Sequence, residues 1–257
     1  MEQEQFNIAQ FGSLLIDIGV ALQSSGANTF RIRIIMQRFA QARNLEPHFI
    51  INPKSIAVTL INADGVSVFT DLHSASAAGV NFKILSGLSR LSWRFIEEEM
   101  SLQQVSDELS RLLALPQYPR WLTLIMVSLA GAGFCFTFGG DLKQMCITFI
   151  ATFIGLFVNQ EFKKRRFNIY LCTYISATVA ALVIALFYAA GLNLKLEQAY
   201  STCVLFLIPG VPLINAFADL LDGEILHGIE RGTNALLHTL AIAFGLTTVL
   251  MIFNFTT

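Results

Sequence analysis

Residues 1–115 alternate between two kinds of hydrophobic pattern. Over residues 5–23 the apolar side chains recur at the i, i+3, i+4, i+7 spacing of an amphipathic helix, and residues 28–43 repeat that spacing. Apolar and polar residues then alternate over 55–61, which is typical of a half-buried strand. A hairpin turn signal, Asp-Gly at positions 64 and 65, follows, so residues 66–70 predict the returning strand.

The rest of this part returns to helical spacing. The remaining predicted elements are a third strand over 49–51, a polar loop over 71–78, and helices over 80–98 and 102–115. The last helix should begin with a capping box, because Ser101 and Gln104 have the required spacing. Together these elements predict an N-terminal cytoplasmic α+β domain over residues 1–118.

From residue 119 the pattern changes to long apolar runs. A helix needs about 20 mostly apolar residues to cross the hydrocarbon core of a bilayer. Five segments meet that length, at about 121–138, 142–160, 168–191, 199–220 and 235–255. The predicted fold class is therefore a membrane protein, with a five-helix transmembrane α bundle over residues 119–257 and the α+β domain before it.

Composition supports this division of the chain. Of the 257 residues, 54% are hydrophobic and 14% are charged, and the mean hydropathy is +0.59. Soluble domains average about 25% charged residues, so an ordinary soluble enzyme is disfavoured. Residues 1–118 hold 9 basic and 11 acidic residues, whereas the longer stretch 119–257 holds 8 and 7. The net charge of −1 argues against a nucleic-acid partner.

The basic residues between the predicted spans indicate an orientation. Lys163, Lys164, Arg165 and Arg166 lie between the second and third spans, whereas the connections after the first and third spans each hold a single lysine. Because loops rich in Lys and Arg stay in the cytoplasm, we expect a cytoplasmic N-terminus and a periplasmic C-terminus. The acidic start and the absence of a basic residue before Arg31 argue against a signal peptide.

The polar residues of the α+β domain do not form a recognisable catalytic motif. His48, Asp71 and His73 lie near the serines at positions 74 and 76, but without the spacing of a nucleophile elbow or a zinc site. The four cysteines, at positions 135, 146, 172 and 203, have no metal-ligand spacing and are expected to pack as thiols. We therefore expect no catalytic residue, no metal and no cofactor, and interpret the chain as a non-enzyme.

The fourth predicted span is interrupted near its middle. It contains Pro209, Gly210 and Pro212, and proline removes a backbone donor and clashes with the preceding turn. Backbone groups freed within a membrane must be satisfied by protein or by water in a cavity, and interrupted helices form binding sites in many transporters. Asn215 and Asp219 follow on one helix face. We expect substrate binding at the break and at Asn215, and proton coupling at Asp219.

The absence of lysine and arginine inside the predicted spans limits how a substrate can be held. An anionic carboxylate would need backbone N–H groups, polar side chains or a cation from a partner. The polar candidates are Thr202 and Asn215, with Thr173, Tyr174 and Ser176 in the third span. A zwitterionic amino acid would need less positive charge, and Asp219 could bind its ammonium group.

Four motifs, taken together, suggest a family. They are Ser25-Gly26-Ala27 with Arg31, Gly79-Val80-Asn81, Tyr118-Pro119-Arg120-Trp121-Leu122, and Pro209-Gly210-Val211-Pro212-Leu213-Ile214-Asn215 with Ala218-Asp219. With them the chain resembles the threonine/serine exporter family over nearly its whole length, most closely the short YjjP-type inner-membrane subunits. The resemblance implies a secondary exporter of the bacterial inner membrane. Long members hold both halves in one polypeptide and are associated with threonine and serine, whereas the short type is associated with succinate and pairs with a second small membrane subunit.

The odd number of predicted spans also favours a partner, because transporters are commonly built from two related halves. A self-sufficient five-helix protein remains the alternative. Two other functions also remain open: a membrane-anchored hydrolase, which would depend on His48 or His73, and a metabolite sensor anchored by its spans. The interrupted fourth span argues against both, because an anchor gains nothing from a broken helix. The expected function is an exporter subunit for a small carboxylate, most simply succinate, with threonine or serine as the alternative substrates.

Overall fold

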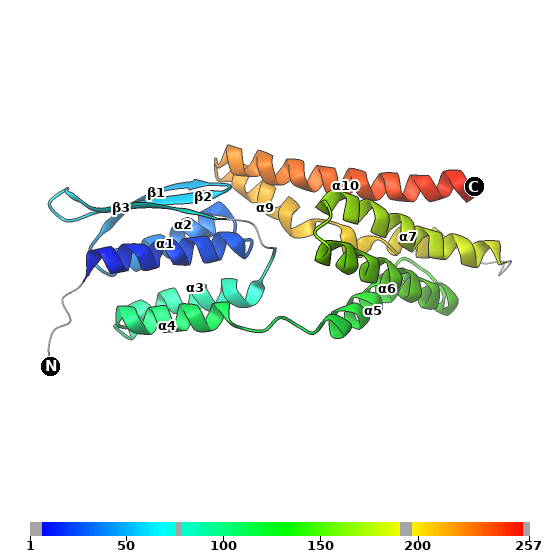
Figure 1. The fold of residues 1–257 in the computed structure, drawn as a ribbon, viewed down its shortest axis with the longest axis horizontal. Helices are drawn as coiled ribbons and strands as arrows, with labels where there is room; N and C mark the ends of the chain where they lie inside the picture. The colour runs from blue at the N-terminus through cyan, green and yellow to red at the C-terminus, as the bar shows by residue number, and fades with distance from the viewer. Residues whose placement is uncertain (1–6, 76–78, 191–196, 254–257) are drawn as a thin grey trace. The chain divides into compact units, whose positions relative to one another are not determined.

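The computed structural model describes residues 7–75, 79–190 and 197–253, and the chain falls into two compact units (Figure 1). The α+β unit comprises residues 1–116 together with 211–232. The helical unit comprises residues 117–210 together with 233–257. Residues 211–232 therefore group with a part of the chain that lies almost a hundred positions earlier. The division into a cytoplasmic domain 1–118 and a membrane domain 119–257 stays a prediction.

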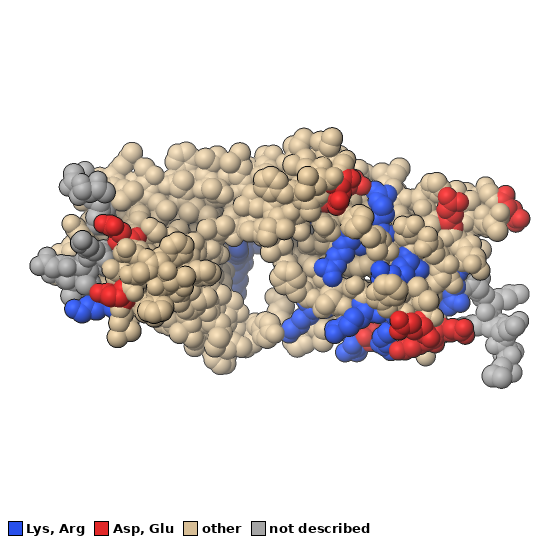
Figure 2. All heavy atoms as spheres, turned by 180° about the vertical axis from the view of Figure 1, so that it is seen from behind, with Lys and Arg blue, Asp and Glu red and all other residues tan. Residues whose placement is uncertain are grey.

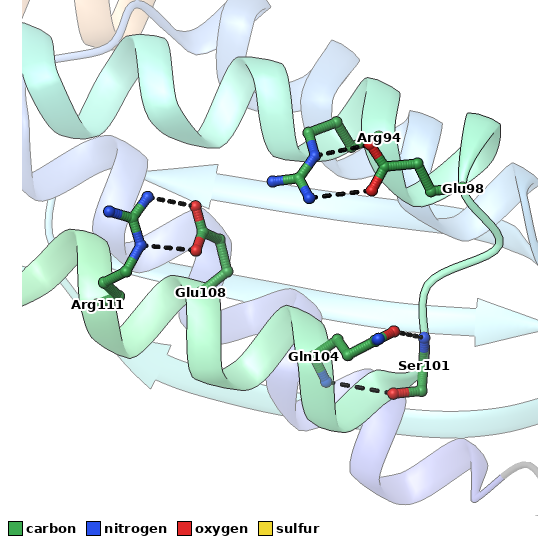
Figure 3. Close-up of polar contacts among 6 residues, drawn as sticks. All are labelled: Arg94, Glu98, Ser101, Gln104, Glu108 and Arg111. Carbon is green, nitrogen blue, oxygen red and sulfur yellow. Dashed lines mark hydrogen bonds and ion pairs between the residues drawn. The ribbon is translucent and has the colours of Figure 1, made fainter.

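Four helices of the α+β unit begin at an Asn or Ser that caps the first turn. They are α1 (Ile8–Ser24), α2 (Thr29–Gln41), α3 (Phe82–Glu97) and α4 (Leu102–Leu113), capped by Asn7, Asn28, Asn81 and Ser101. These caps satisfy N–H groups that lack a partner inside the helix. The predicted capping box is confirmed, because Gln104 N donates to Ser101 Oγ (3.3 Å) and Ser101 N donates to Gln104 Oε1 (2.8 Å), as Figure 3 shows.

An antiparallel sheet of three strands completes this unit. The strands β1 (Glu46–Asn52), β2 (Ser55–Ile61) and β3 (Ser67–Ser74) pair in the order β1-β2-β3. The prediction of a loop over 71–78 is wrong at its start, because Asp71 pairs with Val58 and the ladder continues to Ser74 opposite Ser55. Ladder hydrogen bonds to β2 hold these polar residues in a strand. Residues 76–78 of the predicted loop lie outside the described residues.

The core of the α+β unit consists of large apolar side chains. Every second residue of β2 is buried, as the alternation predicts, and α1, α2, α3 and α4 contribute to the same cluster. Phe95 lies at its centre, with its ring centroid 5.1 Å from that of Phe39 and 6.5 Å from that of Phe11. Burial of each such ring contributes about 1.5–3 kcal/mol, so this unit has a core large enough to hold its helices on the sheet.

Two surface ion pairs lie on α3 and α4 (Figure 3). Arg94 donates to both carboxylate oxygens of Glu98, at 3.0 and 2.9 Å, and Arg111 does the same to Glu108, at 2.7 and 2.6 Å. The hydrogen bonds from arginine, helped by its charge, hold the pKa of each glutamate below its ordinary value. Because these pairs face solvent, they contribute little to stability.

The second half of the chain is helical throughout its described residues. Its elements are α5 (Arg120–Thr137), α6 (Leu142–Lys164), α7 (Ile169–Ala189), α8 (Glu197–Thr202), a 3-10 turn η1 (Leu205–Leu207), α9 (Gly210–Leu221) and α10 (Ile225–Phe253). Four of them, α5, α6, α7 and α10, are long and apolar enough to cross a membrane. The number of spans rises to five if the bent pair 197–207 and 210–221 counts as one. This makes the chain a multi-pass membrane protein, with a span count of four or five.

The last helix begins earlier than its hydropathy predicts. Helix α10 starts at Ile225 rather than near residue 235, because the polar residues that follow the turn at Gly223 are already helical. Its first turns belong to the α+β unit and the rest to the helical unit. The predicted end at 255 lies outside the described residues.

Charged side chains are unequally distributed between the units. Figure 2 shows Lys, Arg, Asp and Glu gathered over the α+β unit, while most of the visible surface of the helical unit is uncharged.

Inside the helical unit, α6 and α7 make close contact through small residues. A Cβ on Gly155 would lie 2.9 Å from Ala180 Cβ and 3.2 Å from the Ser176 carbonyl oxygen. Close approach through small residues is typical of helices packed in a membrane.

Candidate functional site

The predicted interruption of the fourth span is confirmed. Helices 197–207 and 210–221 are bent by 63° at a short break that contains Pro209. Ile208 is extended at this point (φ −63°, ψ 124°), as the residue before a proline prefers. Pro212 lies in the first turn of α9, where a missing backbone N–H leaves no helical hydrogen bond unmade. The two prolines therefore end one helix and begin another instead of merely bending one.

Helix α9 contacts the loop between α1 and α2. Asn215 Nδ2 donates to the carbonyl oxygen of Gly26 at 2.9 Å. Gly26 has φ +83°, a left-handed conformation that glycine adopts without strain and that ends α1. The neighbouring Ser25 carbonyl oxygen accepts from Asn81 N at 3.0 Å, and a Cβ on Gly26 would lie 3.1 Å from Val80 Cγ2. Three motifs that are distant in sequence thus meet at one loop of the α+β unit.

Asp219 is the most completely buried charged residue of this meeting point, with a relative exposure of 0%. Its Oδ1 accepts from the backbone N–H of Thr29 (2.9 Å), the first residue of α2. Its Oδ2 lies 2.9 Å from Nη1 of Arg231, and Arg231 Nη2 donates to the Ala27 carbonyl oxygen at 2.8 Å. A carboxylate at a helix N-terminus beside a guanidinium has both the helix dipole and the cation in its favour. We call Asn215, Asp219 and Arg231, with residues 26–29, the loop clamp.

The helical hairpin formed by α9 and the start of α10 holds the loop clamp together. The turn between them contains Gly223, at φ +82°, and Glu224 N donates to the Asp219 carbonyl oxygen at 2.8 Å. Gly228 lets the two helices approach closely, because a Cβ there would lie 2.5 Å from Leu220 Cγ. Glu224 also forms an ion pair with Arg33 of α2. The clamp is therefore fixed to α2 at two points.

The predicted site residues lie in both compact units. Thr202 is buried in the helical unit, and its hydroxyl donates to the carbonyl oxygen of Gln198 in its own helix (2.6 Å). Gly210 begins α9, and a Cβ there would meet no atom within 4 Å. Among the contacts of the described residues, none joins Thr202 to Asn215. Of the predicted substrate-binding residues, Pro209, Gly210 and Pro212 thus form the break, Asn215 belongs to the loop clamp, and Thr202 lies in the helical unit.

Sequence reasoning missed Arg231 and Thr29 as partners of Asp219. Arg231 lies before the predicted start of the fifth span at residue 235, in a connection, so nothing in the sequence pairs it with Asp219. Nothing local in the sequence indicates that α10 begins at Ile225 and carries the arginine back to Asp219. The one available signal was the order of three residues: the acidic Asp219, a turn at Gly223, and the basic Arg231 after that turn.

A second polar cluster lies between α7 and α10 in the helical unit. Thr173 Oγ1 is 3.0 Å from His238 Nδ1, and Tyr170 OH donates to Asn234 Oδ1 at 2.7 Å. Tyr174, another predicted candidate, has its hydroxyl 3.2 Å from Thr248 Oγ1. Sequence reasoning identified Thr173 and Tyr174 but not His238. The hydroxyl of the third candidate in α7, Ser176, bonds to the Cys172 carbonyl oxygen of its own helix.

The residues of the alternative hydrolase hypothesis are not arranged as a nucleophile with its base. His73 lies between two carboxylates, with Nδ1 3.2 Å from Asp17 and Nε2 3.3 Å from Asp71. His48 is exposed and lies 3.7 Å from Glu46. No contact among the described residues places a serine hydroxyl against either imidazole, and Ser76 lies outside them.

Comparisons with known proteins agree with this architecture. The family model described as "Putative threonine/serine exporter" matches residues 13–253. The chain is 28% identical over 240 residues to "Probable succinate transporter subunit YjjP" of Klebsiella aerogenes, covering 90% of each chain. It is also 28% identical over 246 residues to the protein of the same name in Escherichia coli K12, covering 94% of each. "Pheromone-regulated membrane protein 10" of Pichia sorbitophila is 24% identical over 254 residues, which is 94% of this chain and 25% of that protein.

No solved structure matches the chain. The family model nevertheless spans both compact units, including the broken span and the loop clamp. The curated relatives with this chain's length are named as transporter subunits. The chain belongs to the threonine/serine exporter family, a family of membrane transport proteins.

Proposed function

We propose that this chain is one subunit of a secondary transporter in the bacterial inner membrane that exports a small carboxylate, succinate first. The names of the two bacterial relatives, which describe a succinate transporter subunit, support the substrate and the need for a partner. The partner would be a second small membrane subunit of the same family. With the bent pair counted as one span, five spans make one half of a transporter built from two related halves.

The broken span carries this proposal. Its 63° bend at Pro209 starts a new helix, α9, in whose first turn Gly210 N donates to the Ile208 carbonyl oxygen (2.9 Å) and Pro212 has no N–H. The N–H of Val211, between them, is the donor that we assign to the substrate. Backbone N–H groups at a helix N-terminus are suited to a carboxylate. We assign substrate binding to Pro209, Gly210, Pro212 and Asn215, with Thr202 as a further polar contact. An anchor for a hydrolase or a sensor would have no use for such a break.

Asp219 is the proposed proton-coupling residue, through the loop clamp. Protonation of its carboxylate would remove the charge that holds Arg231 and would weaken the bond from Thr29 N–H. The loop at residues 26–29 would then be released from α9, the helix that follows the break. The α+β unit would in this way act as a cytoplasmic gate that responds to the protonation state of the broken span.

Threonine or serine is the second candidate substrate, and the description of the family model favours it. On electrostatic grounds alone, Asp219 would bind the ammonium group of the amino acid. In the structure that carboxylate is buried and already paired with Arg231, so it is less available to a ligand. This observation favours the dicarboxylate.

The orientation follows from the basic cluster at residues 163–166, which ends α6 and precedes α7. Loops rich in Lys and Arg stay on the cytoplasmic side, so we propose a cytoplasmic N-terminus and a periplasmic C-terminus. The same placement puts the α+β unit in the cytoplasm.

Export assays test the proposed function directly. Cells carrying wild-type chain, Pro209→Ala, Asn215→Ala or the control Ile214→Ala would be loaded with succinate, threonine or serine, and efflux would be measured at matched protein levels. Ile214 lies beside Asn215 on α9 but is 70% exposed and outside the clamp. We expect Asn215→Ala to lower succinate efflux roughly 5- to 10-fold, the effect of losing one buried hydrogen bond, and Ile214→Ala to leave it unchanged. Unchanged efflux in both Pro209→Ala and Asn215→Ala would exclude the broken span as the site.

A further inference from the structure

His238 occupies the polar cluster between α7 and α10, in the helical unit. Its Nδ1 is 3.0 Å from Thr173 Oγ1, and its ring centroid is 5.0 Å from that of Tyr170. Tyr170 is itself fixed by its 2.7 Å hydrogen bond to Asn234. The imidazole is therefore held in one orientation by a hydroxyl and a ring from the first two turns of α7. Ionisable side chains within membrane helices are rare and are functional candidates by default.

The hydrogen bonds of Thr173 decide which imidazole nitrogen carries the proton. Thr173 Oγ1 also lies 3.0 Å from the Ile169 carbonyl oxygen, to which it donates its only hydroxyl proton. We therefore assign Thr173 Oγ1 as the acceptor from Nδ1–H of His238, because a hydroxyl that donates to Ile169 has no second proton. Nε2 is left with a free lone pair, and among the contacts of the described residues none engages it. His238 is half-buried, so this nitrogen can take up a proton from water or from a ligand.

The end of the helical unit that holds His238 is strongly basic. Lys163, Lys164, Arg165 and Arg166 connect α6 to α7, and Arg120 of α5 joins them through its hydrogen bond to Gln160 (2.7 Å). The carboxylate at this end, Glu161, is paired with Arg120 at 3.3 Å and Arg165 at 3.5 Å. A positive potential of this kind concentrates anions.

The polar and charged groups near the imidazole come from α6, α7 and α10. Lys163, at the end of α6, is the charged side chain that acts electrostatically on His238, and as a cation it opposes protonation of the imidazole until an anion is bound. Helix α7 contributes the neutral Tyr170, Thr173 and the thiol of Cys172. On α10 itself the nearest charge is Arg231, two turns earlier, and it is paired with Asp219. No carboxylate of the described residues is paired with His238, so a protonated imidazole would be free to bind an anion.

We propose that His238 binds a proton and a carboxylate group of the transported anion together. Nε2 takes up a proton, and the resulting Nε2–H donates a charge-assisted hydrogen bond to one carboxylate oxygen. The proton returns to water when the anion leaves. The protonated imidazole supplies a cation in the part of α10 after Arg231, which has no lysine or arginine. Anion binding then depends on the uptake of a proton. The inference rests on the proposed export of a carboxylate and assigns that substrate a residue outside the broken span.

Calorimetry of succinate binding to the full chain in lipid nanodiscs tests the inference. Titration at pH 7 in two buffers of different ionisation enthalpy gives the number of protons taken up per succinate bound. Three variants accompany the wild-type chain: His238→Gln, which keeps a donor to Thr173 but cannot be protonated; Thr173→Val; and the control His48→Gln, at a histidine exposed on β1. Elution from size-exclusion chromatography as for wild type confirms that each variant is folded.

For the wild-type chain we expect proton uptake on binding, with affinity that rises as the pH falls, because the proton and the anion bind together. His238→Gln should remove the proton that His238 takes up and weaken binding roughly 10- to 100-fold, the effect of losing a hydrogen bond to a charged group. Thr173→Val should lower the uptake while binding persists, and His48→Gln should match wild type.

Two results would overturn the inference, and they are distinguishable. Succinate binding by His238→Gln with wild-type affinity and proton uptake would exclude His238 while leaving the proposed function intact. Failure of the wild-type chain to bind succinate, threonine or serine, both alone and in membranes that also hold its partner subunit, would instead refute the proposed function, and the inference with it.

Discussion

The two units of this protein fill their interiors in opposite ways. The α+β unit buries large rings such as Phe39 and Phe95, whereas the contacts between helices of the helical unit run through Gly155, Ala177 and Ala180. In the helical unit many phenylalanines are exposed, and Phe138 is 62% exposed. Water drives large apolar groups into a core, but lipid is as apolar as leucine and offers no such force. The difference shows that each unit is built for a different solvent.

The largest expected effect concerns the loss of one buried ring from the α+β unit, compared with the loss of an exposed ring from the helical unit. Phe95→Ala removes a ring that contacts Phe39 and Phe11 and over which the Arg43 guanidinium lies at 4.8 Å. We expect a loss of about 3–5 kcal/mol in the stability of the α+β unit, measured as a fall in the thermal midpoint of the full chain. The matched Phe138→Ala, in the helical unit, should change that midpoint little. Equal losses in both variants would refute the proposed difference in solvent.

The second prediction concerns the loop clamp. Arg231→Ala leaves the fully buried Asp219 without its cation, so we expect a loss at the lower end of about 3–5 kcal/mol, because the backbone N–H of Thr29 still bonds the carboxylate. Adding Asp219→Asn should recover most of the loss, because the unpaired charge is then removed. Arg165→Ala, whose partner Glu161 lies at the surface, serves as the control. A double variant no more stable than Arg231→Ala would mean that the ion pair is not the source of the effect.

The third prediction concerns the contacts between small residues in the helical unit. Gly155→Leu inserts a side chain where even a Cβ would lie 2.9 Å from Ala180 Cβ, and we expect a loss of about 1–3 kcal/mol. Gly133→Leu, on α5, has no atom within 4 Å of the new Cβ and should be tolerated. Thermal midpoints of the two variants in the same detergent measure the contrast. Tolerance of leucine at both positions would show that α6 and α7 are not closely packed.

The smallest effect is a dependence on pH from the surface pairs of α3 and α4. The pKa of Glu98 and of Glu108 is lowered in the folded chain, first by the hydrogen bond from Arg94 or Arg111 and then by its charge. A carboxyl with a lowered folded pKa stabilises the fold above its ordinary value of 4.5, and this contribution is lost as the pH falls below that value. The thermal midpoint of wild type should exceed that of the double variant Glu98→Gln/Glu108→Gln at pH 7. At pH 3.5 the two midpoints should be closer together. A difference that grows on acidification would reverse the predicted sign.

Local patterns predicted much of the fold. Helical spacing located α1 to α4, and the pair Ser101 and Gln104 predicted its capping box. Alternation predicted β2, and the Pro-Gly-x-Pro segment predicted the break after residue 208. Each of these depends on contacts between residues close in the chain, which a sequence shows directly.

The errors came from long-range contacts. Residues 71–74 are polar except for Leu72, so they resembled a loop, but pairing with β2 makes them part of β3. The start of α10 was placed too late, because helical polar residues there carry no hydropathy signal. The partners of the candidate site residues were missed for the same reason: Thr29 and Asp219 are 190 positions apart.

By itself, the sequence determined that this chain has an α+β part and long apolar helices, one of them interrupted by proline, because hydrophobic periodicity, span length and proline geometry are local properties. Only the tertiary structure decided that residues 211–232 return to the α+β unit, that Asp219 is held by Arg231 and the start of α2, and that His238 faces α7 with one nitrogen free. Hydrogen bonds and ion pairs between distant segments depend on how the chain folds back. Their strength comes from burial, which no single stretch of sequence reveals.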